Sequence, residues 1–514
     1  MIVVRSGVMV TAHDAPPLAN GAVAVSGETI ADLGTYEELS SRYPDARVIG
    51  GDRFLLIPGL INGHGHGRGL SSFQRGALDN TLESWIWDTR KFKPLSLYDE
   101  VSYGAAKLLK SGVTTTMHNH ILTGAFPPKQ EFDDAIRAYK DAGMRVLFCP
   151  AIRNDNPFVY GDNKSFFSSL PQHVQTLLSS PPPLSPGDYL DVVRELHAQH
   201  QEPLCHIGLG PVGPQWCTTD LLQRIHQTAE ELGVPVHIHS LESVLQKIHG
   251  LTALGRSHIR FMHDIGFLGP EVVLAHCVWA TESDIQLLAK SGAGVTHQPS
   301  SNLRLRSGIA PVFHMLQAGV RVGLGLDGQG INDNDDFIQE MKLCYLLHRI
   351  SSLELDSPFL SARDVFRMAT ETNAFLLGFE KKLGRLEPGR YADLVLLDFK
   401  QMCFPHTDPK HDPVDVLLYR GSGQDVHTVM VNGRVVVQDG RLLTIDEDAV
   451  AARLAQAASL PGTDKERNYA QALDEMKLYI VRHYHHWPEK LHFDPHFDVN
   501  SRVNGQPSTL FCKK

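Results

Sequence analysis

Short apolar segments, each followed by a longer amphipathic stretch, repeat along residues 58–380 of this 514-residue chain. In one such unit, a helical pattern that ends at residues 229–232 leads into the strand-like segment 234–239. Repeated strand-helix units over about 300 residues match a (β/α)8 barrel of the TIM type, which typically takes about 250 residues plus insertions. We therefore predict a barrel over residues 58–380. Enzymes built on this barrel place their chemistry at the C-terminal ends of the strands.

The two ends of the chain have a different pattern. Residues 1–57 consist of short alternating apolar segments broken by Gly and Asn, and similar segments return at 392–398 and 428–437, the latter with an Asn-Gly turn. We predict that residues 1–57 and 381–445 form one small β-sandwich domain, with the barrel inserted between them. Residues 446–514 form a C-terminal helix and a tail rich in histidine and aromatic residues, to which the sequence assigns no role.

Composition excludes several classes of protein. The formal net charge of -10 is spread along the chain without a basic patch, so nucleic acid is not an expected partner. No apolar run is long enough to span a bilayer, and the first residues lack the pattern of a signal peptide, so we expect a cytoplasmic protein that does not bind membranes. The seven cysteines are scattered and never form C-x-x-C, which is typical of reduced thiols.

An apolar run over residues 56–63 ends at two histidines, His64 and His66. In an extended strand alternate side chains share a face, so both imidazoles could hold one metal ion. A chain with 27 histidines also produces such pairs by chance, so the pair does not decide the question alone.

Other apolar segments also end at ionisable residues. His239 is followed three residues later by Glu242, His276 comes after residues 272–275, and Asp327 comes after residues 322–326. A single histidine on an apolar strand is more often a core residue. Because the C-terminal ends of barrel strands converge, three such ends together with the His-x-His pair favour a common site.

A series of motifs makes the chain resemble the amidohydrolase superfamily, in the branch of aminohydrolases and chlorohydrolases that includes atrazine chlorohydrolase and guanine deaminase. The motifs follow the order of that family and cover most of the chain: residues 58–66, 111–116, 239–242, 274–279, 297–311, 325–328 and 383–395. The resemblance implies a barrel that holds one divalent metal, beside a β-sandwich built from both chain ends. No lysine stands where the binuclear branch keeps its carboxylated bridge, which favours a single metal.

The resemblance also implies roles for particular residues. By motif position the metal ligands are His64, His66, His239 and Asp327, while Glu242 and His276 handle protons, and Asp327 also accepts the proton of the attacking water. Three imidazoles and a carboxylate suit Zn²⁺, with Fe²⁺ as the alternative, and leave a position for water. A bound metal lowers the pKa of that water from 15.7 to about 7, so the nucleophile is water rather than a side chain.

Several nearby residues have competing interpretations. His237 forms a second His-x-His pair with His239, and we interpret it as a residue that packs behind the ligands. Ser301 and Asn302 are expected to shape the rim, and Cys277 to be buried packing. Two G-x-G-x-x-G stretches, 208–213 and 323–328, lack the context of a dinucleotide site. A group of polar and aromatic residues could line a pocket or simply pack, namely Arg68, Gln74, Trp85, Trp87 and Trp216.

The leading functional hypothesis is metal-dependent hydrolysis of a C-N bond in a small, neutral, ring-bearing molecule, most simply deamination of an amino-heterocycle. Adenosine-analogue deaminases carry a Pro-His-Ala type motif before the fifth barrel strand, whereas residues 208–216 contain no histidine, which argues against a nucleoside. The alternatives are hydrolysis of an amide, urea or carbamate, or displacement of chloride. A non-catalytic scaffold with the same fold would have lost ligands, yet every ligand position is intact. We also expect a homo-oligomer, a dimer or larger.

Overall fold

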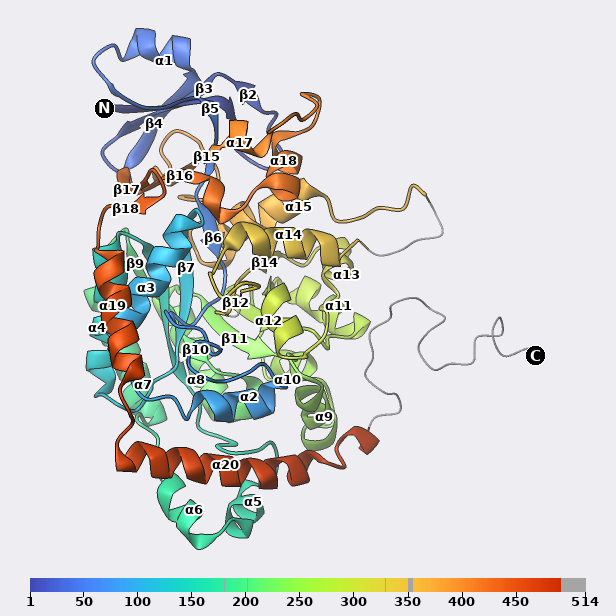
Figure 1. The fold of residues 1–514 in the computed structure, drawn as a ribbon. Coiled ribbons are helices and arrows are strands. Elements are labelled where there is room, and N and C mark those ends of the chain that lie inside the picture. Colours follow the sequence, from blue (N-terminus) through green and yellow to red (C-terminus); the bar gives the residue numbers. More distant parts are fainter. Residues whose placement is uncertain (180, 201, 329, 350–354, 491–514) are drawn as a thin grey trace, which may run out of the picture.

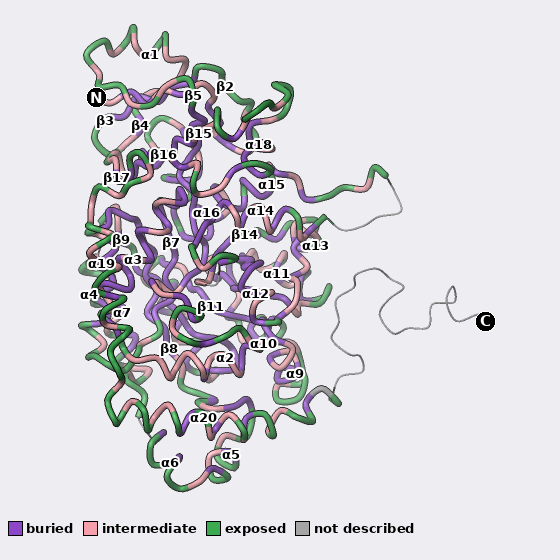
Figure 2. The backbone as a smooth tube through the Cα atoms, viewed as in Figure 1, coloured by how far each residue is buried: buried purple, intermediate pink, exposed green. Residues whose placement is uncertain are grey.

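The computed structural model describes residues 1–490 apart from 180, 201, 329 and 350–354. Figure 1 shows a β domain with the short helix α1 (Tyr36–Arg42) at the top, a barrel of strands and helices below it, and helix α20 (Asp464–Tyr484) crossing the opposite end. Buried backbone is concentrated along the strands of the barrel, while the outer helices expose one face (Figure 2). No helix within these described ranges combines the length and apolar character needed to cross a bilayer.

Eight parallel strand positions form the barrel, because β9 and β10 pair one after the other with β8 and share one position. The predicted fold class is confirmed. One sheet has the order β10-β8-β7-β6 with β9 beside β8, and the other has the order β11-β12-β13-β14. A parallel bridge between Leu209 and Val236 joins the two sheets. The Gly63 N–H donates to the Leu324 carbonyl at 2.9 Å, which closes the last strand on the first. The strands are β6 (Leu60–Asn62), β7 (Val113–His120), β8 (Arg145–Ile152), β9 (Cys205–Ile207), β10 (Gly210–Pro211), β11 (Val236–Ser240), β12 (Val272–His276), β13 (Gly294–His297) and β14 (Val322–Leu324).

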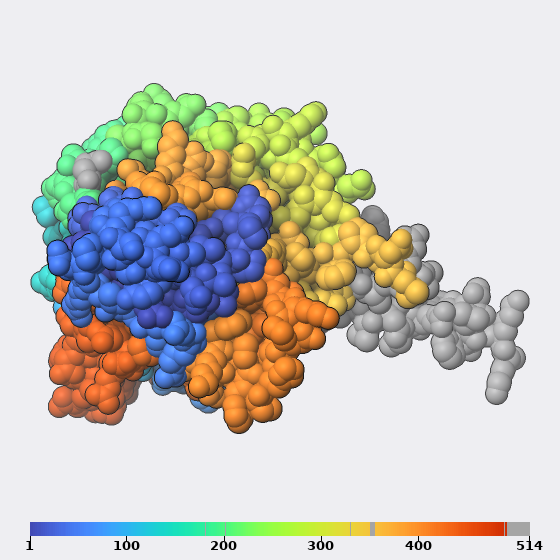
Figure 3. All heavy atoms as spheres, turned by 90° about the horizontal axis from the view of Figure 1, so that it is seen from above, coloured from blue at the N-terminus to red at the C-terminus, as the bar shows by residue number. Residues whose placement is uncertain are grey.

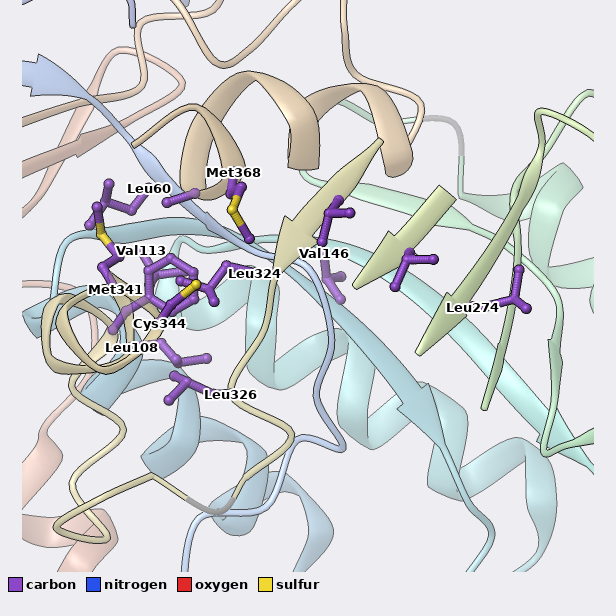
Figure 4. Packing of buried hydrophobic residues seen from close by; sticks show 14 of the residues in the cluster. Leu60, Leu108, Val113, Val146, Leu274, Leu324, Leu326, Met341, Cys344 and Met368 are labelled. Carbon is purple, nitrogen blue, oxygen red and sulfur yellow. The ribbon is translucent and has the colours of Figure 1, made fainter. Parts of the chain in front are cut away.

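Helices between the strands cover the barrel. Side-chain caps such as Ser96, Thr218 and Thr281 satisfy free backbone N–H groups where these helices begin, and Gly143 and Gly233 end two of them in the left-handed conformation. Their apolar faces meet the strands in one large core, part of which is drawn in Figure 4. These helices are α2 (Leu82–Thr89), α3 (Leu97–Lys110), α4 (Pro128–Ala142), α5 (Asn163–Ser169), α6 (Gln172–Leu178), α7 (Pro186–Gln199), α8 (Thr219–Leu232), α9 (Val244–Ala253), α10 (His258–Asp264), α11 (Glu282–Ser291), α12 (Pro299–Arg304), α13 (Val312–Gln317), α14 (Phe337–Leu347), α15 (Ala362–Arg367) and α16 (Asn373–Leu376).

Both chain ends contribute to one nine-stranded sheet, as the sequence predicts. Its order is β18-β17-β16-β15-β5-β1-β3-β4, with β2 beside β1, and β5 pairs antiparallel with β15 to join the N- and C-terminal parts. The Ala392 N–H donates to the Glu28 carbonyl at 2.8 Å, so the two ends of the sheet meet around a common apolar core. The adjacent blue and orange surfaces in Figure 3 show this union. The strands are β1 (Ile2–Met9), β2 (Leu18–Ala19), β3 (Gly21–Ser26), β4 (Thr29–Thr35), β5 (Arg47–Pro58), β15 (Leu394–Asp398), β16 (Val426–Val431), β17 (Arg434–Gln438) and β18 (Arg441–Leu442), with α17 (Phe399–Met402) and α18 (Pro413–Arg420) between β15 and β16.

A buried ion pair connects the β domain to the barrel. Arg145, at the start of β8, donates to the carboxylate of Asp393, just before β15, and both side chains are almost fully buried. The same guanidinium donates to the Thr115 hydroxyl at 3.2 Å and lies over the Tyr391 ring. Partners on both sides therefore compensate the desolvation of the charges.

The C-terminal region forms two helices, α19 (Glu447–Ser459) and α20, rather than the one predicted. Pro461 and Gly462 separate them, since proline removes a backbone donor and glycine favours non-helical conformations. The aromatic residues Tyr484 and Trp487 pack with Tyr160 at the mouth of the barrel. The remainder of the predicted tail, from residue 491, lies outside the described residues.

Candidate active site

The four candidate metal ligands meet at one point of the barrel mouth. His64 and His66 stand just beyond the end of β6, while His239 lies in β11 and Asp327 follows β14. The Nε2 atoms of His64 and His66 are 3.1 and 3.0 Å from the same oxygen, Oδ1 of Asp327. Ligand atoms of His64, His66 and His239 also lie within 4.8 Å of one another. Residues 263 positions apart in the sequence therefore face a common centre.

Backbone carbonyl groups orient two of the imidazoles. The Nδ1 of His66 is 2.9 Å from the Asn119 carbonyl oxygen, and the Nδ1 of His239 is 2.7 Å from that of Val212. Because a carbonyl only accepts, each Nδ1 carries the proton and each Nε2 presents its lone pair to the centre. This is the protonation state that a metal requires of a histidine ligand.

Asp327 is held as a carboxylate with one oxygen directed to the histidines. The Ser301 hydroxyl donates to Oδ2 at 2.6 Å, which leaves Oδ1 facing His64 and His66. Burial raises the pKa of Asp327, but its interactions with His64 and His66 outweigh burial and hold the pKa well below its usual value. Asp327 has a left-handed backbone with φ of +60°, an unusual conformation for a residue other than glycine that often marks a functional site.

Two asparagines that the sequence did not single out join the first and last barrel strands beneath these ligands. The Asn62 side chain accepts from the Leu326 N–H at 2.9 Å and donates to the Thr116 hydroxyl at 3.1 Å. Asn373 donates from its amide to the carbonyls of Ile61 and Leu324, at 2.6 and 2.7 Å. Asn62 could have been suspected from its place next to the His-x-His motif. Asn373 is distant in sequence and has no local pattern that would reveal it.

Glu242 and His276 face each other beside the ligands. Nε2 of His276 is 3.7 Å from Oε2 of Glu242, and its Nδ1 is 2.8 Å from Oδ1 of Asn302, an acceptor that places the proton on Nδ1. Burial is the main cause that lowers the pKa of His276 to about 4 and raises the pKa of Glu242 well above its usual value. The pair therefore combines a neutral imidazole that accepts with a carboxyl group that can carry a proton.

The structure separates the residues with competing interpretations. His237 stacks on His64, with ring centroids 4.9 Å apart and planes 5° from parallel, so it packs against a candidate ligand. Cys277 is fully buried, and burial raises the pKa of its thiol, which disfavours a thiolate nucleophile. Neither glycine-rich stretch opens an α-helix: residues 208–213 precede the 3-10 turn Pro214–Trp216, and 323–328 spans the end of β14.

The suggested pocket residues have different environments. Trp216 is buried against Tyr160, and Trp87 belongs to a cluster with α20. The side-chain oxygen of Gln74 accepts from the Ser71 N–H and so holds a local turn. Arg68 stands near the candidate centre, with its guanidinium 5.8 Å from the Trp85 ring.

The donor set fits a divalent metal. Three neutral imidazoles and one carboxylate, all at the end of a barrel, match the ligands that Zn²⁺ prefers when a position is kept for water. The carbonyl partners of His66 and His239 supply the surrounding support that such ligands usually have.

Comparison with known proteins agrees with this geometry. A model of the amidohydrolase family matches residues 55–436. The chain belongs to the amidohydrolase family. A shorter match, to an imidazolonepropionase-like composite domain of bacteria, covers residues 21–46 in the β domain of this amidohydrolase.

Curated relatives of similar length carry the names of deaminases. A 5'-deoxyadenosine deaminase of Methanothermobacter thermautotrophicus is 32% identical over 456 residues, which cover 87% of this chain and 96% of the relative. A 5-methylthioadenosine/S-adenosylhomocysteine deaminase of Syntrophus aciditrophicus is 30% identical and covers 86% and 93%.

Solved structures of the family share the fold. Atrazine chlorohydrolase from Arthrobacter aurescens TC1, in complex with zinc, superposes with a TM-score of 0.74 at 27% identity and covers 89% of this chain and all of its own. A zinc-bound adenosine deaminase from Xanthomonas campestris has a TM-score of 0.73 at 24% identity, with 93% and 98% covered. The amidohydrolase described here is a metal-dependent hydrolase, and these zinc-bound neighbours agree with one divalent metal, Zn²⁺.

Proposed function

We propose that this amidohydrolase deaminates an amino-heterocycle, with His64, His66, His239 and Asp327 as the ligands of one Zn²⁺. The observation that carries the proposal is the convergence of two imidazoles on one Asp327 oxygen, beside a neutral His276 that faces Glu242. Deamination exchanges an amino group on a ring carbon for oxygen from water, and releases ammonia. The reaction needs an activated water and groups that move protons.

The residues of the chain divide these tasks. His64, His66, His239 and Asp327 would hold Zn²⁺, which when bound would lower the pKa of water toward about 7. Asp327, kept ionised by His64 and His66, accepts the proton that the attacking water releases. Glu242 carries a proton within reach of the substrate and delivers it to a ring nitrogen, while the Nε2 of His276 accepts a hydrogen bond and orients the attacking oxygen.

Curated relatives widen the range of substrates to test. The absence of a histidine in residues 208–216 argues against a nucleoside, whereas the relatives are named for 5'-deoxyadenosine and 5-methylthioadenosine. A panel should therefore contain adenosine analogues together with guanine-like bases, pterins, triazines and phenylureas.

The product distinguishes the proposal from its rivals. Ammonia from an aminated ring supports deamination, an amine or aniline supports urea or amide hydrolysis, and chloride supports the reaction that names the chlorohydrolase neighbour. The purified wild type should contain one equivalent of zinc, and Asp327→Asn should lose both zinc and activity. A protein without stoichiometric metal, whose Asp327→Asn variant behaves as wild type, would refute the mechanism and favour a non-catalytic scaffold.

Assembly and location are proposed on separate grounds. We propose a cytoplasmic homo-oligomer, because the six described cysteines are free thiols and closed homo-oligomers are common among soluble enzymes. Light scattering of the purified protein and fractionation of its host cells test these two statements.

A further inference from the structure

Helix α12, which begins just after strand β13, carries the partners of two candidate catalytic residues. The Ser301 hydroxyl donates to Oδ2 of Asp327 at 2.6 Å, and Oδ1 of the next residue, Asn302, lies 2.8 Å from Nδ1 of His276. Ser301 and Asn302 are both fully buried. A helix of only six residues therefore orients the carboxylate at the candidate metal site and the imidazole beside it.

The start of α12 is tied to the strand that carries His276, but it lacks a cap of its own. Gln298 occupies the N-cap position, yet its side-chain oxygen accepts from the backbone N–H of His276 at 3.0 Å and caps no N–H of α12. Pro299 has no N–H to satisfy, so the first backbone donor of the helix is that of the buried Ser300. A buried N–H at this position needs an acceptor from elsewhere in the chain.

Glu340 provides this acceptor from helix α14. Its Oε1 accepts from the Ser300 N–H at 2.9 Å, across 40 positions of sequence. Helix α14 packs against α12, and Glu340 is almost fully buried. The N-terminal turn of α12 is thus capped by a side chain from the helix that follows the next barrel strand.

Glu340 makes no other polar contact that would explain its presence. Within the described ranges its side chain hydrogen-bonds only to Ser300, forms no ion pair, and keeps Oε2 buried without a hydrogen-bond partner. Burial is the main cause that raises the pKa of Glu340 to about 8, so the group is largely neutral at neutral pH. A buried carboxyl group with a single partner is unfavourable for folding, so an apolar side chain would serve better in a role of packing alone. The contact with Ser300 is therefore the feature that explains a glutamate at this position.

We propose that Glu340 is a positioning residue of the hydrolytic site, which fixes the start of α12 and thereby the orientation of Asp327 and His276. Without its cap the first turn of α12 is free to shift, and Ser301 and Asn302 shift with it. A displacement of about 1 Å near the reacting groups can lower a rate by about 10²-fold. The proposal rests on the proposed function, which gives Asp327 and His276 their roles at the zinc ion.

Two substitutions of Glu340 separate its hydrogen bond from its size. Glu340→Met removes the acceptor and keeps the length of the side chain, so kcat should fall by about 10- to 100-fold with little change in KM, because α12 holds groups that act on the attacking water. Glu340→Gln keeps an oxygen for the Ser300 N–H and should restore most of the activity.

Asp284→Asn is the matched control and should retain the wild-type kcat. Asp284 is a buried carboxylate that accepts from the Thr281 N–H at 2.9 Å at the start of α11. No candidate catalytic residue lies on α11, so a change at this cap tests whether any buried helix cap matters equally.

Zinc binding provides a readout that needs no substrate. In competition with a chelator, Glu340→Met should bind zinc about tenfold more weakly, because Asp327 loses its fixed orientation, whereas Glu340→Gln and Asp284→Asn should bind zinc as the wild type does. Thermal unfolding of the zinc-free proteins shows whether each variant is folded. If Glu340→Met is not, Glu340→Asp, whose carboxyl group is one methylene shorter, replaces it with the same expected loss. Equal losses in Glu340→Met and Glu340→Gln would overturn the proposal, and so would wild-type zinc affinity together with wild-type kcat in Glu340→Met.

Double-mutant cycles test the path through α12. Glu340→Met is combined in turn with Ser301→Ala and with Asn302→Ala, and each combined loss of kcat/KM is compared with the product of the two single losses. A combined loss clearly smaller than that product, for at least one pair, supports action through α12, because a side chain that is already released cannot be released again. Independent losses in both pairs would overturn it. If the wild type binds zinc but deaminates no compound of the panel, the deaminase function fails, whereas weaker zinc binding in Glu340→Met with recovery in Glu340→Gln still supports the positioning role.

Discussion

This protein contains two clusters of histidines whose ligand atoms lie near one another, and only one of the two is arranged as a metal site. The rim cluster consists of His64, His66, His239 and Asp327. The outer cluster consists of His297 at the end of β13 with Cys344 and His348 of the α14 region, whose ligand atoms also lie within 4.8 Å of one another. Figure 4 shows Cys344 among the apolar residues Met341, Met368 and Leu324.

The two clusters differ in what occupies their nitrogen atoms. In the rim cluster, backbone carbonyl groups accept hydrogen bonds from the Nδ1–H groups of His66 and His239. The Nε2 atoms therefore keep their lone pairs for the centre of the cluster. In the outer cluster the Nε2 atoms of His297 and His348 face each other at 3.0 Å, and one hydrogen bond satisfies both. Burial also raises the pKa of the Cys344 thiol. Histidine orientation and a central carboxylate, rather than the number of histidines, therefore distinguish a metal site.

The largest expected effect comes from removing the carboxylate that the outer cluster lacks. Asp327→Asn should lower kcat/KM by about 10⁴-fold and abolish stoichiometric zinc, because several kcal/mol of charge stabilisation are lost. Metal analysis by mass spectrometry and an ammonia assay measure both. Full zinc content in this variant would mean that Asp327 is not a ligand and that a central carboxylate does not distinguish the rim cluster from the outer cluster.

Glu242 is the next most sensitive position. Glu242→Gln keeps the shape of the side chain and removes its proton, so kcat should fall by about 10²- to 10⁴-fold while zinc remains at one equivalent. The control Glu282→Gln lies on the N-terminal turn of α11 and should retain full activity. Loss of zinc from Glu242→Gln would assign Glu242 to the metal rather than to proton transfer.

Substitution of Asn302 tests whether the orientation of the His276 ring contributes to activity. Its side-chain oxygen accepts a hydrogen bond from His276 Nδ1, so Asn302→Ala should release the ring and lower kcat by about 10- to 100-fold with zinc retained. Asn302→Asp keeps the acceptor and should restore most of the activity. Wild-type kcat in Asn302→Ala would show that packing alone positions His276.

His348 should make the outer cluster sensitive to acid. Burial lowers its pKa from 6.5 to about 4 in the folded protein. Between these two pH values the imidazole is protonated in the unfolded chain but neutral in the folded protein. Stability is then lost as the pH falls from about 6.5 to 4, by up to about 1.4 kcal/mol per pH unit. In His348→Gln the decrease between pH 7 and pH 5, measured by urea unfolding, should be smaller. An identical slope in the variant would contradict the lowered pKa, and exposed His485→Gln serves as control.

Cys344 should have the smallest effect. Cys344→Ala removes one buried sulfur from an apolar environment, so we expect about 1 kcal/mol of destabilisation and unchanged zinc content and kcat. A second equivalent of zinc in the wild type that disappears in this variant would show that the outer cluster is also a metal site, and would break the comparison.

Much of this arrangement follows from local sequence patterns. The alternation of strand and helix predicts the barrel, and the Asn-Gly turn with its flanking apolar residues predicts that the chain ends form one β domain, because the periodicity of buried residues reflects secondary structure directly. The candidate ligands could be identified because each follows an apolar segment that becomes a barrel strand. The bounds proposed for the domains, 1–57, 58–380, 381–445 and 446–514, stay predictions.

Other features depend on contacts that no local pattern contains. The carbonyls of Asn119 and Val212 orient His66 and His239. Every residue has a backbone carbonyl, so the sequence does not indicate which ones accept these hydrogen bonds. Asn373 joins β6 to β14 from a helix more than 300 residues beyond β6.

The sequence by itself determined the fold, the family and the types of ligand, since hydrophobic period and motif order are local properties of the chain. Only the tertiary structure decided which of the many histidines present a free lone pair. The physical reason is that the protonation and charge of a buried group depend on the partners that folding brings to it, and those partners come from distant parts of the chain.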